Sequence, residues 1–325
     1  MKKNLIIIFL TTLIVLAVEF VGYNFFFKKT IVYQIKEFRK STGYKMINPV
    51  IDFIELNPLK ITETNDLENE LNLYINKVIS EKKADTVSVY FRDLNNGPWI
   101  GIGENNYYSP ASLLKVPVLI AVLKEAEENP DFLTKKIVYV PKNKNLSRNI
   151  TDGTFLKENK VYSISELLEY MIIHSDNDAV YILLDMINKQ TMHDIYYDLG
   201  IPIENHSDDN CITVKEYASY FRILYNATFL NKKMSEKALT LLSKTTFNKG
   251  IVAGVPKGVI VAHKFGERHF VRKNVMQLHD CGIVYKEKRP YLLCIMTKGN
   301  KFEELEKVIS EISAIVYNNG EMKVN

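Results

Sequence analysis

Apolar residues form one nearly continuous run at the start of the chain: residues 5–18 carry no charge, Glu19 is the first break, and apolar residues then resume as far as Phe27. About 20 apolar residues span a bilayer as a helix, whereas a cleavable signal peptide has a shorter apolar stretch that ends in a small-x-small site. Because no convincing site of that kind follows Leu16, we expect a transmembrane anchor at residues 1–27. A cleaved signal peptide is the alternative.

Lys2 and Lys3 precede this run and favour an N-inside orientation, although Lys28 and Lys29 on the far side weaken the charge asymmetry. Under either alternative the rest of the chain is exported. We therefore expect a single-pass protein of the cell membrane whose folded part is extracytoplasmic.

Residues 28–64 contain Pro49 and Pro58 and show no sustained periodicity, so we expect a stalk and entry segment there, followed by one folded domain at residues 65–325. Residues 66–83 place their apolar side chains on one stripe at spacings of three and four, which predicts an amphipathic helix. Residues 86–94 are rich in β-branched and aromatic side chains and, with the turn and residues 99–102 that follow, predict a β-hairpin.

The middle of the domain is predicted to be helical. Pro110 precedes an apolar-rich segment that ends before Pro130. Ser163 with a Glu three residues later, and Thr213 with a Glu at the same spacing, are capping-box patterns that mark helix starts. The predicted helices cover residues 111–128, 163–174, 178–189 and 213–225.

The end of the chain returns to strand patterns, at residues 259–264, 276–285 and 291–297, and closes with an amphipathic helix at residues 302–318. Strands at both ends with a helical insert between them predict an α+β fold, in which one antiparallel β-sheet is flanked by the terminal helices and accompanied by an all-helical lobe. We expect the functional site in the crevice between sheet and lobe.

The composition of the 325 residues, 46% hydrophobic and 25% charged, is that of a globular protein. The net charge of +4 is spread along the chain, so we expect no nucleic-acid partner. The histidines are scattered and the cysteines form no C-x-x-C pair, so neither a metal nor a cofactor is indicated. Cys281 and Cys294 fall nearly opposite each other on two predicted strands, where a disulfide and a pair of core thiols are both open.

Three short motifs carry the candidate chemistry. The first is Ser112-Leu-Leu-Lys115, an S-x-x-K pattern in which residues three apart lie on one helix face, so the Lys amine can take the proton of the Ser hydroxyl. The N-terminus of that helix adds a favourable field for the developing alkoxide. A second copy, Ser80 to Lys83, lacks the Pro, small-residue and apolar context and is interpreted as a solvated helix end.

The second motif is Ser175-Asp176-Asn177, whose hydroxyl can relay a proton and whose amide can bind a substrate amide, although such residues also favour caps and turns. The third is His263-Lys264-Phe265-Gly266-Glu267, which places Lys264 on an edge strand beside Gly266, where a substrate backbone can approach. We expect His263 to have a packing role.

In this order the motifs resemble the S-x-x-K, S-D-N and K-T-G signature of class A β-lactamases and penicillin-binding D,D-peptidases, over residues 66–318. The resemblance implies that Ser112 is the acylated nucleophile and Lys115 its base. It further implies that Ser175 relays a proton, Asn177 binds a substrate amide and Lys264 supplies positive charge.

The resemblance also implies an oxyanion hole formed by the backbone N–H groups of Ser112 and Glu267. Asp176 is expected to hold the lobe together. The substrate class implied is a β-lactam or a peptidoglycan peptide.

Two departures qualify the resemblance. Phe265 stands where the family has Thr or Ser, so a hydroxyl that binds the substrate carboxylate is missing, and Arg268 or Arg272 is the candidate substitute. No E-x-x-L-N motif occurs between residues 177 and 213, so the water-activating Glu of class A β-lactamases is missing as well. The acidic residues available in its place are Glu204, Asp208 and Asp209.

We therefore expect a serine hydrolase that is peptidase-like or esterase-like rather than an efficient β-lactamase. The alternative, favoured by Phe265, is a non-catalytic module that binds cell-wall fragments.

Overall fold

The computed structural model describes residues 35–39, 43–48, 51–55, 62–95, 99–141, 154–198 and 212–319. The anchor predicted at residues 1–27 lies outside them, and no described helix has the length and apolar content needed to cross a membrane. The chain divides into two compact units, Met1–Lys36 with Phe53–Lys60, and Glu37–Asp52 with Ile61–Asn325. Strands β1 (Ile35–Arg39) and β2 (Ile51–Glu55) pair as a two-stranded sheet. The second unit carries the predicted site.

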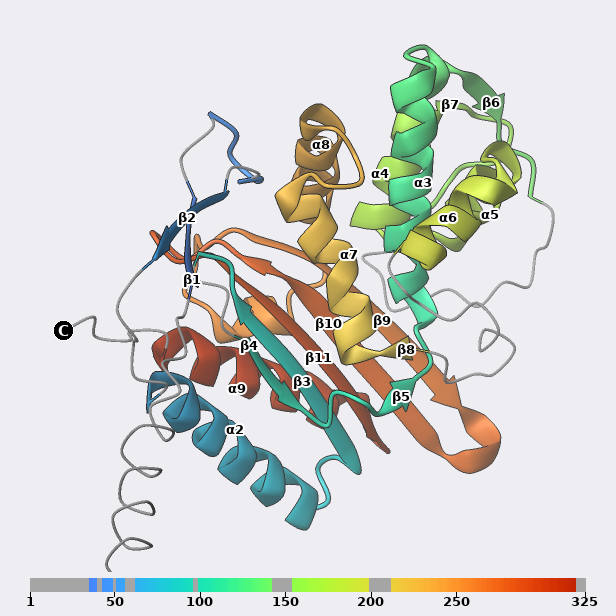
Figure 1. Ribbon diagram of the computed structural model, residues 1–325. Coiled ribbons are helices and arrows are strands. Elements are labelled where there is room, and N and C mark those ends of the chain that lie inside the picture. Colours follow the sequence, from blue (N-terminus) through green and yellow to red (C-terminus); the bar gives the residue numbers. More distant parts are fainter. Residues whose placement is uncertain are drawn as a thin grey trace, which may run out of the picture. The chain divides into compact units, whose positions relative to one another are not determined.

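An antiparallel sheet is the centre of this unit, with the order β4-β3-β11-β10-β9 (Figure 1). Its strands are β3 (Thr86–Asp93), β4 (Trp99–Ile102), β9 (Val261–Phe270), β10 (Val275–Val284) and β11 (Tyr291–Gly299). The predicted hairpin is present as β3 and β4, and β9 is an edge strand, as expected. Cys281 and Cys294 are directly opposite each other on β10 and β11 and form a disulfide.

The two helices from the ends of the domain, α2 (Thr62–Ser80) and α9 (Phe302–Asn319), lie side by side on one face of the sheet (Figure 1). Leu71 and Ile75 of α2 and Ile309 of α9 are buried against Val89 and Ile295 of the sheet. The apolar stripe that predicted an amphipathic helix at residues 66–83 is therefore the surface that covers the sheet.

The opposite face of the sheet carries the helical lobe (Figure 1). Its α-helices are α3 (Lys115–Glu128), α4 (Ile164–Ile173), α5 (Asn177–Met186), α6 (Lys189–Asp198), α7 (Val214–Asn226) and α8 (Lys232–Leu242). Helix α7 packs on the sheet, and α3 lies in the middle of the lobe, with every residue from Val116 to Leu123 buried. A helix that is apolar all round is typical of such a central position.

Both predicted capping boxes are present. The Ser163 hydroxyl accepts from Glu166 N at 3.2 Å while the Glu166 carboxylate accepts from Ser163 N at 2.7 Å. Thr213 and Glu216 form the same reciprocal pair at 3.2 and 2.8 Å. These bonds satisfy N–H groups that a helix start leaves without an intrahelical partner.

Several elements differ from the sequence prediction. Helices α6 and α8 were not predicted, although Asn231, which caps α8 by accepting from Met234 N at 3.0 Å, was an available signal. Short ribbons join β5 (Tyr107–Tyr108) to β8 (Ile212–Thr213) and β6 (Lys136–Val138) to β7 (Val161–Ser163). Four 3₁₀ turns complete the described elements: η1 (Ala111–Leu114), η2 (Phe132–Thr134), η4 (Ile251–Gly254) and η5 (Val271–Lys273).

Residues 43–48, which lie in the predicted stalk, pack into the same unit. Met46 and Ile47 are 3% exposed and belong to the core of the helical lobe. The Glu236 carboxylate accepts hydrogen bonds from the backbone N–H groups of Lys45, Met46 and Ile47, at 2.9 to 3.1 Å. The folded unit thus includes residues upstream of position 65.

Candidate active site

Ser112 lies on the 3₁₀ turn η1, and the α-helix starts only at Lys115. The sequence predicted an α-helix from residue 111, so the first turn is a correction. Leu113 N donates to Pro110 O at 2.9 Å, and Ala111 adopts a left-handed conformation with φ of 47°. Non-glycine residues in this region carry backbone strain, which persists only where surrounding contacts hold it.

Three residues far away in the sequence hold this turn. The Gln277 side chain accepts from Ser109 N at 2.9 Å, the His279 ring bonds Ser109 O at 3.0 Å, and the Tyr217 hydroxyl donates to Leu113 O at 3.0 Å. The sequence analysis missed all three. A usable signal was the pair of polar residues at alternate positions of β10, which predicts that both face the same side of the sheet.

His279 is fully buried and neutral. Its Nδ1 accepts from Thr297 N at 3.3 Å, so Nε2 carries the proton that it donates to Ser109 O. Burial lowers the pKa of His279 to about 3. The hydrogen bond to Ser109 O therefore persists at neutral pH without charge.

Gly266 brings β9 against the nucleophile turn. A Cβ at this position would lie 2.8 Å from Pro110 O, 2.9 Å from Leu113 Cγ and 3.1 Å from Leu113 N. The missing side chain thus makes room for the protein's own backbone, a packing role that the sequence did not indicate; the expected approach of a substrate backbone at Gly266 stays a prediction.

Lys115 and Ser112 form the first hydrogen-bonded pair of the site. Lys115 Nζ lies 2.7 Å from Ser112 Oγ and 2.8 Å from Asn177 Oδ1, and the Lys115 side chain is nearly completely buried. Burial lowers the pKa of the Lys115 amine to about 7, against the opposing effect of the Asp176 and Glu267 carboxylates. A large share of Lys115 is therefore unprotonated at neutral pH, as a general base requires.

Lys264 and Ser175 form the second pair. Lys264 Nζ donates to Ser175 Oγ at 3.0 Å and to Phe265 O at 3.1 Å, and Lys264 has no exposed surface. Burial, and then the neighbouring Lys115, lower the pKa of Lys264 well below its usual value. The environment thus opposes the positive charge that the sequence predicted for Lys264.

The start of α5 presents Ser175 and Asn177 to these lysines. Ser175 has a left-handed φ of 56°. The Asp176 carboxylate caps α5 by accepting from Ala179 N at 2.8 Å and also accepts from Leu156 N at 3.3 Å. Asp176 therefore joins two segments of the lobe, as expected. Its neighbour Ser175 contacts Lys264, and its neighbour Asn177 contacts Lys115.

Four further residues from the sequence analysis lie along β9 and the turn after it. Phe265 is 2% exposed, and its ring stacks on Phe247 with centroids 4.2 Å apart. Glu267 is half-buried, and Arg268 is exposed with its guanidinium 5.3 Å from the Phe270 ring. Arg272 is exposed in η5, and Glu204, Asp208 and Asp209 lie outside the described residues.

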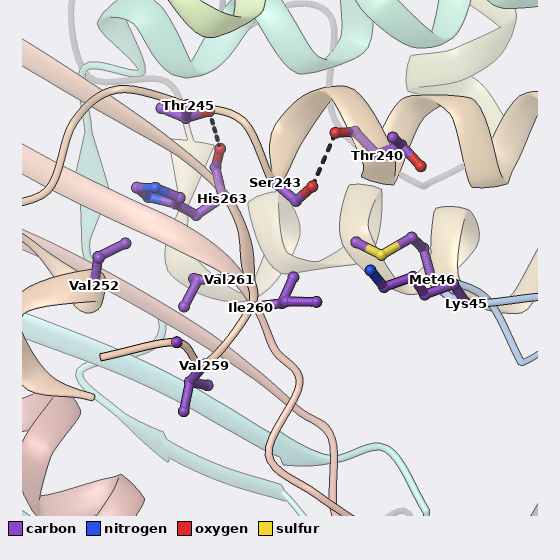
Figure 2. Close-up of a pocket in the computed structure, with 11 residues that line it drawn as sticks. Lys45, Met46, Thr240, Ser243, Thr245, Val252, Val259, Ile260, Val261 and His263 are labelled. Atoms are coloured by element: carbon purple, nitrogen blue, oxygen red, sulfur yellow. Dashed lines mark hydrogen bonds between the residues drawn. The ribbon is translucent and has the colours of Figure 1, made fainter. Parts of the chain in front are cut away.

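A cavity of about 320 Å³ lies beside this cluster, between residues 45–46, the end of α8 and the start of β9 (Figure 2). His263 lines this cavity, whereas Ser112, Lys115, Ser175 and Lys264 do not. His263 is buried with Nδ1 2.7 Å from Asp280 Oδ1, and its backbone O accepts from Thr245 Oγ1 at 3.0 Å (Figure 2). No group of three metal-ligating side chains occurs among the described residues.

Comparisons with known proteins agree with this architecture. Residues 70–319 match the family described as the β-lactamase enzyme family. The β-lactamase VEB-1 of Pseudomonas aeruginosa is 24% identical over 284 residues, which cover 79% of this chain and 93% of that protein.

Among solved structures, TLA-3 extended-spectrum β-lactamase has a TM-score of 0.68 at 23% identity and covers 78% of this chain and 98% of its own. A PBP-A mutant in its acyl-enzyme complex with penicillin G has a TM-score of 0.66 at 21% identity, with coverages of 80% and 97%. At these identities the likeness concerns the fold.

Proposed function

The chain belongs to the β-lactamase enzyme family, whose match spans residues 70–319, and on that premise we propose that it is a serine acyl-hydrolase in which Ser112 is acylated by β-lactams or peptidoglycan peptides. The observation that carries this proposal is the 2.7 Å contact between Ser112 Oγ and the buried, low-pKa amine of Lys115. A hydroxyl becomes an effective nucleophile when a neutral base lies within hydrogen-bond reach.

In the proposed reaction, Lys115 takes the proton of Ser112 as Oγ attacks the carbonyl carbon of the substrate amide. The resulting oxyanion is received by the backbone N–H groups of Ser112 and Glu267, each such donor being worth ~3 kcal/mol. The proton taken up by Lys115 is relayed through the Ser175 hydroxyl, which is hydrogen-bonded to Lys264, to the leaving nitrogen as the C–N bond breaks, and the acyl group remains on Ser112. Water then attacks this ester and restores the hydroxyl.

We propose that the last step is slow with β-lactams. The E-x-x-L-N motif is missing between residues 177 and 213, and this favours a peptidase or esterase-like hydrolase over an efficient β-lactamase. The PBP-A mutant of matching fold was solved as an acyl-enzyme complex with penicillin G. Glu204, Asp208 and Asp209 are the candidates for activating water.

We also propose that residues 1–27 anchor the chain in the cell membrane with the folded unit outside. The uncharged run that follows Lys2 and Lys3 supports this. Fractionation of cells that express the full chain and a chain lacking residues 1–27 tests it. Equal amounts of both in the soluble fraction would contradict an anchor.

Labelling of the domain that starts at Lys28 with a fluorescent penicillin tests the catalytic proposal. We expect one label per chain, complete loss of label in Ser112→Ala, and full labelling in Ser80→Ala, which alters the serine of the second S-x-x-K pattern. Release of the label over hours and slow turnover of nitrocefin would show slow deacylation. If penicillin, a fluorophosphonate and a D-Ala-D-Ala peptide all leave Ser112 unmodified, the chain is no serine hydrolase.

The buried Phe265 in place of a hydroxyl favours a second candidate, a non-catalytic module that binds cell-wall fragments. Calorimetric binding of a muropeptide, with neither cleavage of that peptide nor labelling of Ser112, would identify this function.

A further inference from the structure

The ring of Phe265 lies between a second aromatic ring and the Lys264 amine. Phe247 stacks on it with a centroid separation of 4.2 Å and an interplanar angle of 17°. Lys264 Nζ lies over the same ring, 4.1 Å from its centroid. Two groups that are both about 4 Å from the centroid cannot share one face of a ring, because they would overlap at van der Waals contact. Phe247 and the amine therefore occupy opposite faces.

This arrangement determines what Lys264 can contact. Its amine donates to Ser175 Oγ and Phe265 O, and the ring covers a further side. Lys264 is 0% exposed and Phe265 is 2% exposed, so solvent reaches neither side chain appreciably. A substrate carboxylate would have to displace one of these contacts to reach the amine.

The aromatic face also has an electrostatic role. The π-electrons of a ring attract a cation on its face, and the attraction is strongest where water is excluded. The Phe265 ring thus supports the protonated state of an amine whose burial opposes charge, and the carboxylates of Asp280 and Glu267 act in the same direction. A threonine or serine at this position would offer a hydroxyl instead and would leave space for water.

We propose that Phe265 is a positioning residue that determines specificity, because it holds the Lys264 amine on Ser175 and away from a substrate carboxylate. The enzyme therefore acts on acyl donors whose terminal carboxylate is masked as an amide or ester as readily as it acts on the free acid. The inference rests on the proposed acylation of Ser112. It concerns which donors the site selects, whereas the proposed function concerns whether the serine reacts.

The test compares second-order acylation rate constants for benzylpenicillin and its methyl ester, which differ only in the carboxylate. For the wild-type full chain we expect the acid-to-ester ratio to lie within about threefold of one, a smaller difference than a hydrogen bond to a charged group produces. In Phe265→Thr we expect the ratio to rise by about tenfold or more, because a hydroxyl and an accessible amine then bind the acid in a charge-assisted contact.

Phe265→Leu separates the two roles of the ring, which are keeping a substrate carboxylate away from Lys264 and supporting the charge of its amine. Leucine is apolar but has no π-face. We expect the acylation rate constants for benzylpenicillin and its methyl ester to fall together, while the acid-to-ester ratio stays near the wild-type value. We also expect the pH profile of acylation to shift, because the protonated form of Lys264 loses support. Phe229→Leu is the matched control. It removes another lysine–ring contact, that of Lys124, 5.2 Å from the Phe229 centroid, and is expected to leave ratio and profile unchanged.

A wild-type enzyme that prefers the acid by about a hundredfold, the value of a strong charge-assisted contact, would overturn the inference without touching the proposed function. An unchanged ratio in a folded Phe265→Thr protein would also overturn it. Failure of both probes, a fluorophosphonate and a D-Ala-D-Ala peptide to acylate wild-type Ser112 would overturn the proposed function and this inference with it. The wild-type comparison requires no variant to fold.

Discussion

The Lys115 amine lies 2.7 Å from the Ser112 hydroxyl inside a part of the protein where Lys115 is only 3% exposed. Proximity makes proton transfer possible, and burial moves the pKa of the amine to about 7, into the range where the transfer is effective.

Acylation of Ser112 should therefore follow the titration of Lys115. We expect the acylation rate constant to rise with pH through about 7 and to level off above it, since only the unprotonated amine accepts the hydroxyl proton. Lys115→Arg should lower the acylation rate constant by about 10²–10⁴-fold and remove its rise with pH. Stopped-flow measurements with a fluorescent penicillin between pH 5 and 10 check it, with Lys124→Ala as the control. A pH-independent wild-type rate would exclude Lys115 as the base.

The same burial makes Lys115 costly for stability. The pKa of Lys115 is about 7 in the folded protein against an ordinary lysine value of 10.5, so the unfolded chain binds more protons between these values and the stability of the fold rises with pH across this window. Lys115→Met should stabilise the protein by roughly 2–5 kcal/mol at pH 7. The gain should shrink toward pH 10.5, and urea denaturation at several pH values measures it. A gain of constant size would show that packing rather than ionisation is responsible.

His279 should stabilise the turn that carries Ser112 and should make the stability of the protein depend on pH in the acid range. His279→Ala removes the hydrogen bonds to Ser109 O and from Thr297 N and should cost about 2–4 kcal/mol at pH 7. Because the pKa of His279 is about 3 in the folded protein against an ordinary histidine value of 6.5, the stability of the wild-type protein should fall as pH drops from 6.5 toward 3, and the variant should lack this pH dependence. His269→Ala, at an exposed position, is the control for thermal denaturation; an equal loss there would contradict the role of His279.

Gly266→Ala should impair catalysis because the new methyl group meets the backbone of the nucleophile turn. A shift of about 1 Å at a reacting group costs about 10²-fold in rate, so we expect acylation to fall by at least that factor while the domain stays folded by circular dichroism. Gly101→Ala is the control, since the atoms its methyl group would meet belong to the side chains of Trp99 and Glu104. Unaltered acylation in Gly266→Ala would show that the turn tolerates displacement.

The disulfide between Cys281 and Cys294 should be present in protein prepared without reductant. Of the three cysteines, only Cys211 should react with iodoacetamide in the unreduced, denatured chain, and all three should react after reduction. Mass spectrometry distinguishes one adduct from three. Three adducts before reduction would mean that the two strand cysteines are thiols.

The elements that the sequence predicted depend on neighbours along the chain. The period of α2, the capping boxes at Ser163 and Thr213, and the strands of the sheet all involve residues a few positions apart, and these predictions were confirmed. The 3₁₀ turn at Ser112 was not predicted, because it is held by Gln277, which is 168 residues away from Ser109. The packing contact of Gly266 with the nucleophile turn was missed for the same reason, since it depends on the approach of η1 to β9.

The sequence alone determined which chemical groups this protein has, the order in which the motifs around Ser112, Ser175 and Lys264 occur, and hence the family-like fold that carries them. Only the tertiary structure decided how those groups act. The distance from Lys115 to Ser112, the enclosure of Lys264 by Phe265, and the direction of each pKa shift arise from burial and contacts between distant segments, because desolvation and hydrogen bonding depend on what surrounds a group in space.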